Sequence, residues 1–172
     1  MILGTNKNYC NGALFEAKIG MNLEQQIKDL GGFVDPKTLN VFIKRQMVGQ
    51  FLRHGQLEKM FFNSRNSFSK AELSKSHIPD FAFYNSKTKV LTIIEVKSQT
   101  RSGTTDEKIL AGPFLKSQYS KLCKKADDAL RLNFIYVLND WWKHDRYKDY
   151  LHYLLNNGIV CHFGEISFKT LL

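Results

Sequence analysis

Residues 78–97 read IPDFAFYNSKTKVLTIIEVK, and this stretch decides the fold that we predict. Two runs within it, Asp80 to Tyr84 and Val90 to Lys97, are rich in the β-branched and aromatic residues that favour strands. The residues between the runs, Asn85-Ser86-Lys87-Thr88, have a composition typical of a turn. The stretch therefore predicts a β-hairpin.

Three ionisable residues stand at one end of this hairpin. Successive side chains of a strand alternate between its faces, so Glu95 and Lys97 project on the same side. The hairpin folds Asp80 back towards Glu95, and two converging carboxylates suit a hard cation such as Mg²⁺, with Mn²⁺ as the alternative. Lys97 beside that cation could position or deprotonate a water that attacks a phosphodiester. Glu-Val-Lys is also a common pattern on the exposed face of an edge strand.

Helical patterns precede the hairpin. Apolar residues recur at helical spacing over Asn22 to Leu30, which predicts a short amphipathic helix that ends at Gly31-Gly32. Between Leu39 and Phe62, apolar and basic residues interleave without clean alternation. We expect mostly helix there, within a helical and basic insert at about 39–77.

Helices and strands alternate after the hairpin. We expect a helix over about Phe114 to Leu130, a buried strand at Phe134 to Leu138, a helix over Tyr147 to Leu155 and a last strand at Ile159 to Phe163. This order predicts an α/β fold in which helices flank a central mixed sheet.

The size and composition of the chain limit what it can be. Its 172 residues suit one compact domain, 1–172, and 43% hydrophobic residues are enough for a core. A formal net charge of +9 favours a polyanionic partner, and nucleic acid is the leading candidate. Three cysteines without a CxxC pair indicate neither a disulfide framework nor a zinc ribbon. No stretch reads as a signal peptide or a membrane span, so we expect a cytoplasmic protein without a membrane partner.

Ile78-Pro79-Asp80 and Glu95-Val96-Lys97 resemble the two halves of the PD-(D/E)xK motif, which restriction endonucleases, Holliday-junction resolvases and related DNA-repair nucleases share. Residues 20–32 resemble the N-terminal helix of that family with its inward-facing acid. The resemblance implies a restriction-endonuclease-like core of the αβββαβ type. It also implies a set of roles: Asp80, Glu95 and the Val96 carbonyl as metal ligands, Lys97 as the catalytic lysine and Glu24 as an additional acid. An acid in the first turn of a helix is favourable in any case, so Glu24 suits a solvent-facing charge equally well.

Further contacts are expected beyond the catalytic strand. Gln99 continues the face of Lys97 and could hydrogen-bond a metal-bound water or a phosphate. The run 98–108 looks like a loop that follows the catalytic strand in some type II restriction endonucleases, and its hydroxyls and amides suit phosphate contacts. A plain helix cap explains Thr104 and Glu107 nearly as well. The residues that we expect at the DNA are Lys44, Arg45, Arg53, Arg65, Lys75, His77, Arg101, Ser102, Thr104, Thr105 and Lys108.

These features favour a Mg²⁺-dependent endodeoxyribonuclease acting on double-stranded DNA, of the type II restriction class. The chain is small for a protein that both recognises and cuts, so we expect a homodimer or a catalytic subunit beside a larger recognition protein. A Holliday-junction resolvase or a DNA-repair nuclease is the first alternative, since resolvases are basic dimers of similar size. A non-catalytic DNA-binding module on a nuclease-like fold is the second, and the intact Asp80, Glu95 and Lys97 argue against it.

Overall fold

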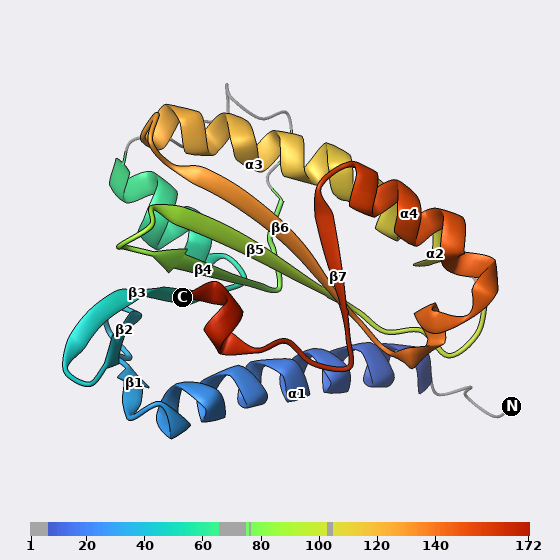
Figure 1. The fold of residues 1–172 in the computed structure, drawn as a ribbon, viewed down its shortest axis with the longest axis horizontal. Helices are drawn as coiled ribbons and strands as arrows, with labels where there is room; N and C mark the ends of the chain where they lie inside the picture. Colours follow the sequence, from blue (N-terminus) through green and yellow to red (C-terminus); the bar gives the residue numbers. More distant parts are fainter. Residues whose placement is uncertain (1–6, 66–74, 76, 103–104) are drawn as a thin grey trace, which may run out of the picture.

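The structure is a computed structural model, and it describes residues 7–65, 75, 77–102 and 105–172. Within these residues, seven strands form one mixed sheet with helices on both faces (Figure 1). The order of the strands in the sheet follows their order in the chain. The strands are β1 (Gly32–Val34), β2 (Asn40–Ile43), β3 (Gln46–Arg53), β4 (Phe81–Asn85), β5 (Val90–Lys97), β6 (Arg131–Leu138) and β7 (Ile159–Phe163).

The pairing of neighbouring strands changes from antiparallel to parallel at β5. Strands β1 to β5 pair antiparallel, whereas β6 pairs parallel to β5 and β7 parallel to β6. Parallel neighbours need a crossover connection, and helices provide both crossovers. The α-helices are α1 (Lys7–Asp29), α2 (Thr105–Lys108), α3 (Gly112–Ala126) and α4 (Lys148–Asn156). Shorter helical segments are Leu57–Phe62, Asn63–Arg65, Ile109–Ala111, Asp140–Lys143, Asp145–Tyr147 and Phe168–Leu171.

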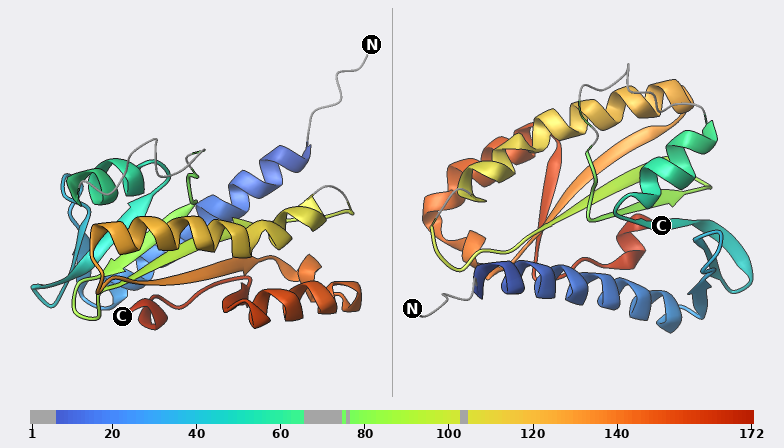
Figure 2. Two further views of the ribbon diagram at one scale, coloured as in Figure 1. Left: turned by 90° about the horizontal axis from the view of Figure 1, so that it is seen from above. Right: turned by 180° about the vertical axis from the view of Figure 1, so that it is seen from behind.

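Two apolar cores lie on opposite faces of the sheet. Because side chains alternate along β5, Ile93 enters the core shared with α3 and α4, where it meets Tyr119. Ile94 enters the other core, which contains Leu23 of α1 and Phe168 near the C-terminus. The right-hand view of Figure 2 shows α1 and α3 on opposite sides of the sheet. The central strands are therefore covered on both faces.

The first helix is longer than the periodicity predicts. It begins at Lys7 instead of Asn22, although its C-terminal end at Asp29 agrees with the prediction. Glycines inside the helix lower its helical propensity and hide the earlier turns in the sequence. Gly20 packs closely, because a Cβ there would lie 3.0 Å from the Phe81 ring.

The prediction of a helical insert at about 39–77 is wrong for most of its described residues. Residues 40–53 form β2 and β3, which belong to the main sheet, and only 57–65 are helical. The neighbours Phe51 and Leu52 point to opposite faces and are both buried, one in each core. A strand covered on both faces has no hydrophobic alternation, and it can therefore resemble a buried helix in sequence.

The remaining elements agree with the sequence. β5 and β7 have the predicted bounds, β4 differs by one residue at each end, and α3 and α4 overlap the predicted helices. The α/β class with a mixed sheet flanked by helices is confirmed. The described helices all lack either the length or the apolar character that crossing a lipid bilayer requires.

Candidate functional site

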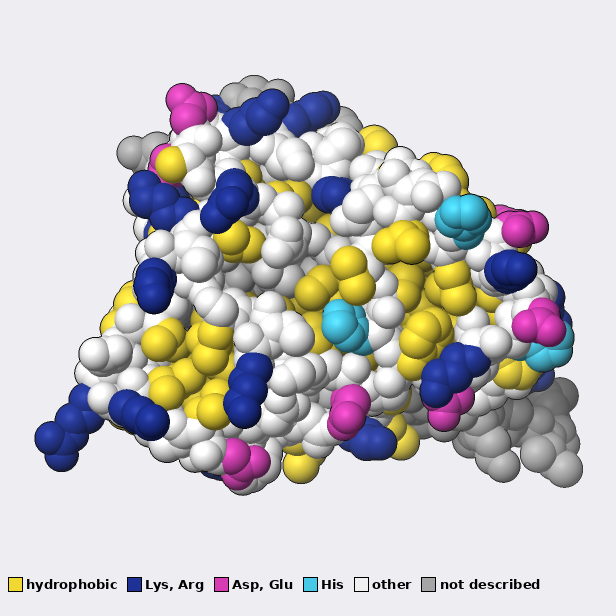
Figure 3. All heavy atoms as spheres, viewed as in Figure 1, with side chains coloured by type: hydrophobic (Ala, Val, Ile, Leu, Met, Phe, Trp, Pro, Cys, Tyr) yellow, Lys and Arg dark blue, Asp and Glu magenta, His cyan; other side chains and the backbone are white. Residues whose placement is uncertain are grey.

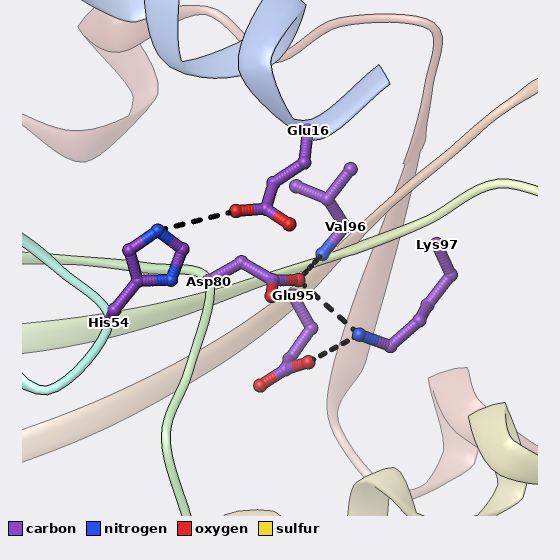
Figure 4. Close-up of polar contacts among 6 residues, drawn as sticks. All are labelled: Glu16, His54, Asp80, Glu95, Val96 and Lys97. Atoms are coloured by element: carbon purple, nitrogen blue, oxygen red, sulfur yellow. Dashed lines mark hydrogen bonds and ion pairs between the residues drawn. The ribbon is translucent and has the colours of Figure 1, made fainter. Parts of the chain in front are cut away.

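The register of the β4–β5 hairpin brings Asp80 to the end of β5. Phe81 pairs with Ile94, so Asp80, one residue earlier, stands opposite Glu95. The Val96 amide donates to Oδ2 of Asp80 over 2.7 Å and fixes the carboxylate against the strand. Figure 4 shows the Asp80 side chain directed at β5. The short turn between β4 and β5 therefore brings Asp80 and Glu95 together.

Lys97 joins these two carboxylates. Its Nζ lies 2.6 Å from Oε2 of Glu95 and 3.3 Å from Oδ2 of Asp80 (Figure 4). Only 9% of the Glu95 side chain and 25% of the Lys97 side chain are exposed. We call Asp80, Glu95 and Lys97 the carboxylate–lysine cluster. Glu95 and Lys97 lie on the same face of β5, as the alternation of side chains along a strand predicts.

Burial and charge shift the protonation of the cluster. Burial raises the pKa of Glu95, the Asp80 and Glu16 carboxylates raise it further, and Lys97 opposes the shift. Burial alone would lower the pKa of Lys97, but Glu95 and Asp80 more than offset this and raise it. In this state Lys97 is an ammonium ion and hydrogen-bond donor, so it cannot accept a proton.

Glu16 is a further acid beside the cluster, and the sequence analysis does not predict it. Figure 4 shows Glu16 reaching from α1 towards Asp80. Burial raises the pKa of Glu16 and so does the charge of Asp80, while His54 and Lys97 lower it. The signal in the sequence is its spacing, because Glu16 precedes the buried Ile19 and Leu23 by three and seven residues on one helix face. A helix begun at Asn22 leaves this acid out.

Glu24, the acid expected from the family resemblance, pairs with Arg53 of β3. Its Oε1 is 2.6 Å from Nη2 of Arg53, and both side chains are partly exposed. The Arg53 guanidinium also lies over the rings of Phe51 and Phe81, at 5.6 and 5.7 Å from their centres. These contacts hold α1 against β3 and engage Arg53, which we expected at the DNA.

Gln99 is bound to the protein itself. Its Nε2 donates to Oδ1 of Asp106, which also accepts from the Tyr147 hydroxyl at 3.1 Å. The side chain of Asn139 bonds both to the backbone N–H and to the carbonyl of Gln99. Within the described part of the chain, Oε1 of Gln99 is buried without a hydrogen-bond partner. The network ties the end of β5 to α2 and to the segment before α4.

Two buried tyrosines stand near the cluster on the α3 side. Tyr136 of β6 is the parallel partner of Glu95, and the Tyr119 hydroxyl donates to the His77 carbonyl at 2.9 Å. Burial raises the pKa of both phenols, and the charges of Glu95 and Asp80 add to the shift. Both tyrosines therefore remain neutral, and Tyr119 holds the segment that leads into Asp80.

The residues expected at the DNA lie on several elements. Lys44 and Arg45 are exposed between β2 and β3, whereas the Arg65 guanidinium lies 3.8 Å from the centre of the Phe61 ring. Thr104 lies outside the described residues, and Thr105 begins α2. On the face drawn in Figure 3, Lys and Arg side chains are spread among apolar ones. The remaining exposed members of the set are Lys75, Arg101, Ser102 and Lys108.

The donor chemistry of the cluster fits a hard divalent cation. Asp80 and Glu95 offer carboxylate oxygens, the ligands that Mg²⁺ prefers, and Lys97 offsets part of their charge. Among the described residues, no three His, Cys, Asp or Glu side chains lie close enough together to hold a metal ion. A Mg²⁺ site here would use few protein ligands, as Mg²⁺ sites commonly do.

Comparison of the chain with family models, curated proteins and solved structures gave no match. The function must therefore be inferred from the chemistry of the site. The arrangement offers two carboxylates that can hold a cation, an ammonium that can bind an anion, and a nearby third acid. Such a set suits hydrolysis of a phosphate ester, in which a cation and a donor both stabilise developing negative charge.

Proposed function

We propose that this protein is a Mg²⁺-dependent endonuclease that hydrolyses DNA phosphodiester bonds at the carboxylate–lysine cluster. The observation that carries the proposal is the contact of Lys97 with both Asp80 and Glu95 at the buried end of one hairpin. An edge strand with a solvated Glu-Val-Lys face would expose these side chains. Instead β5 lies between β4 and β6, and Glu95 is almost wholly buried. The net charge of +9 favours a polyanionic substrate.

The proposed roles follow from the contacts. Asp80 and Glu95, with the Val96 carbonyl, would hold Mg²⁺, which supplies a water of lowered pKa and stabilises charge on the phosphate. Lys97 would donate hydrogen bonds to a phosphate oxygen or to the attacking water, because both carboxylates favour its protonated form. Glu16 would orient water or add a ligand from the α1 side. Tyr119 and Tyr136 exclude bulk water beneath Glu95.

The finer fold assignment is part of the same proposal. We assign α1, β3, β4, β5, α3 and β6 to a restriction-endonuclease-like core of the αβββαβ type. The order of these elements along the chain agrees with that type. The agreement supports the PD-(D/E)xK resemblance, because the motif acids then come from the two strands of the central hairpin.

The substrate that we propose is double-stranded DNA, cut by an enzyme of the type II restriction class. Cutting both strands needs two catalytic centres or two successive events, and one chain has one cluster within its described residues. A homodimer or a larger recognition subunit would supply what is missing.

Incubation of the purified protein with plasmid DNA and Mg²⁺ tests the proposal. We expect cleavage that chelation of Mg²⁺ abolishes, and we expect Asp80→Ala and Lys97→Ala to lower the rate by about a hundredfold or more with DNA binding retained. Lys89→Ala is the matched control, because Lys89 also pairs with an acid, Asp127 at 3.2 Å, at the far end of β5. That variant should cut like the wild type.

The products decide the class of enzyme. Discrete plasmid fragments indicate restriction, and selective cutting of four-way junctions indicates a resolvase. Full activity in Asp80→Ala or in Lys97→Ala would refute the assignment. Retarded migration of DNA without any cleavage in Mg²⁺ or Mn²⁺ would instead identify a DNA-binding module on this fold.

A further inference from the structure

The turn after β3 holds a strained residue next to the cluster. His54 has a φ of +45°, a left-handed conformation that costs free energy in residues with a side chain. Its backbone N–H lies 3.3 Å from the Asp80 carbonyl and donates to it. The next residue, Gly55, has open space around it and would adopt such a conformation more easily. The strain is therefore carried by His54 although a glycine is adjacent.

The ring of His54 reaches the acid from α1. Its Nε2 lies 3.6 Å from Oε1 of Glu16, an ion-pair contact when the ring is protonated (Figure 4). The exposed fraction is 62% for the His54 side chain and 28% for Glu16, so the ring stands at the solvent side of the acid. One residue thus contacts two acids, Asp80 through its backbone and Glu16 through its side chain.

Attachment of α1 does not require this contact. The preceding residue, Arg53, already binds α1 through Glu24 at 2.6 Å, and the apolar face of α1 is buried in the second core. The two pairs connect the same elements, and the Glu16 pair is the one that the charge of Asp80 reaches. Strained backbone conformations cluster at functional sites, and this one lies beside an acid of the cluster.

We propose that His54 is a positioning residue of the endonuclease site, whose left-handed backbone directs its ring to hold the Glu16 carboxylate beside Asp80. The inference rests on the proposed function. His54 acts through Glu16 and does not enter the reaction, so its removal leaves the cluster intact but lets Glu16 leave its working position. Misplacement of a group by about 1 Å can cost up to about a hundredfold in rate.

His54→Gly separates the backbone from the ring, because glycine keeps the turn and its N–H while it removes the side chain. We expect a Tm equal to or above that of the wild type, a kcat lower by about tenfold to a hundredfold, and an unchanged KM for DNA. Glu16→Gln should lower kcat similarly. The double variant should be no slower than Glu16→Gln alone, because His54 acts only through Glu16 and both changes disrupt the same interaction.

Three controls distinguish positioning from general damage. Lys89→Gly replaces another left-handed residue, with a φ of +53°, far from the site, and should cut normally. His54→Asn, which tolerates the same backbone and offers an amide donor, should fall between glycine and the wild type. Added imidazole should partly restore kcat in His54→Gly and should not do so in Glu16→Gln.

Calorimetric titration with Mn²⁺ gives a readout independent of turnover. We expect weaker Mn²⁺ binding in both His54→Gly and Glu16→Gln, and no change in Lys89→Gly. If His54→Gly matches the wild type in cleavage and in Mn²⁺ binding, the positioning role is refuted while the endonuclease stands. If the wild type itself cuts no DNA, the proposed function fails and the role of His54 fails with it.

Discussion

The buried carboxyl of Glu95 links the proposed function to stability at a single residue. Folding raises its pKa, so the native state binds this proton more tightly than the unfolded chain does. Stability therefore falls as the pH rises from the ordinary range of a glutamate to the raised value, and above that value ionised Glu95 opposes folding. Lys97 acts in the same sense at higher pH, because its raised pKa stabilises the fold until the pH rises through the lysine range.

Glu95→Gln should make the protein more stable and less active. The amide has nearly the same shape and carries no charge, so it removes the cost of a buried ionised carboxyl and also the proposed metal ligand. We expect a higher Tm at neutral and mildly alkaline pH, a gain that disappears in acid, and a cleavage rate lower by about a hundredfold or more. Thermal unfolding across pH measures this. Glu24→Gln is the control, and a Tm gain in Glu95→Gln that does not depend on pH would contradict the prediction.

The contrast between Glu95 and Glu16 defines how much of the site can be predicted from the sequence. Strand alternation and a short turn are local rules, and they are enough to predict that Asp80, Glu95 and Lys97 lie together. Glu16 reaches Asp80 only because α1 packs across the sheet, a contact between distant parts of the chain. The position of the His54 ring depends on a left-handed backbone conformation, which the residue type does not predict. Local chemistry is predictable here and long-range packing is not.

The β2–β3 hairpin shows the same limit for whole elements. Ile43 pairs with Gln46, so the turn consists of Lys44 and Arg45 alone. Both have a positive φ, of 49° and 67°, as a type I′ turn requires. The usual sequence signal for such a turn is Asn-Gly, and Lys-Arg gives none. Without that signal, the interleaved apolar and basic residues of β2 and β3 resemble a helix, whereas β5 and β7, with clear turns before them, are predicted correctly.

Replacing the residues of this turn should raise stability and weaken DNA binding. Lys44→Asn with Arg45→Gly supplies the favoured turn and should raise the free energy of unfolding by about 1 kcal/mol. If the exposed tip binds DNA as the sequence predicts, losing two cations lowers the slope of log affinity against log salt concentration by about 2. Urea unfolding and filter binding at several salt concentrations measure the two effects.

The matched control removes the same charge elsewhere. Lys121→Ala with Lys124→Ala takes two exposed cations from α3 and leaves the tip intact. A smaller change in salt slope for this pair than for the tip variant would place the tip at the DNA. Equal slopes in the two variants would mean that the tip acts only through the net charge of the molecule.

At the scale of the whole molecule, the C-terminal segment fastens the α1 side of the fold. The Gln26 side chain of α1 donates to the Ile166 carbonyl at 3.0 Å and accepts from the Phe168 amide at 2.7 Å. The Asn85 amide donates to the Leu171 and Leu172 carbonyls. These bonds hold the buried Phe168 against Phe83 of β4, with ring centres 5.0 Å apart. The core beneath α1, which positions Glu16, thus depends on residues far from the site.

Phe168→Ala should therefore act on the fold alone. Removing a buried phenylalanine costs about 3–5 kcal/mol, a large part of the about 5–15 kcal/mol that stabilises a typical domain. We expect a much lower Tm and early loss of cleavage on warming, with near-normal kcat and KM in the cold, where the chain stays folded. Urea unfolding and cleavage at two temperatures check this against Phe33→Ala, whose ring is 56% exposed and whose removal should change stability little. A low kcat in fully folded Phe168→Ala would mean instead that the α1 core shapes the site more directly, through Glu16 and its contact with His54.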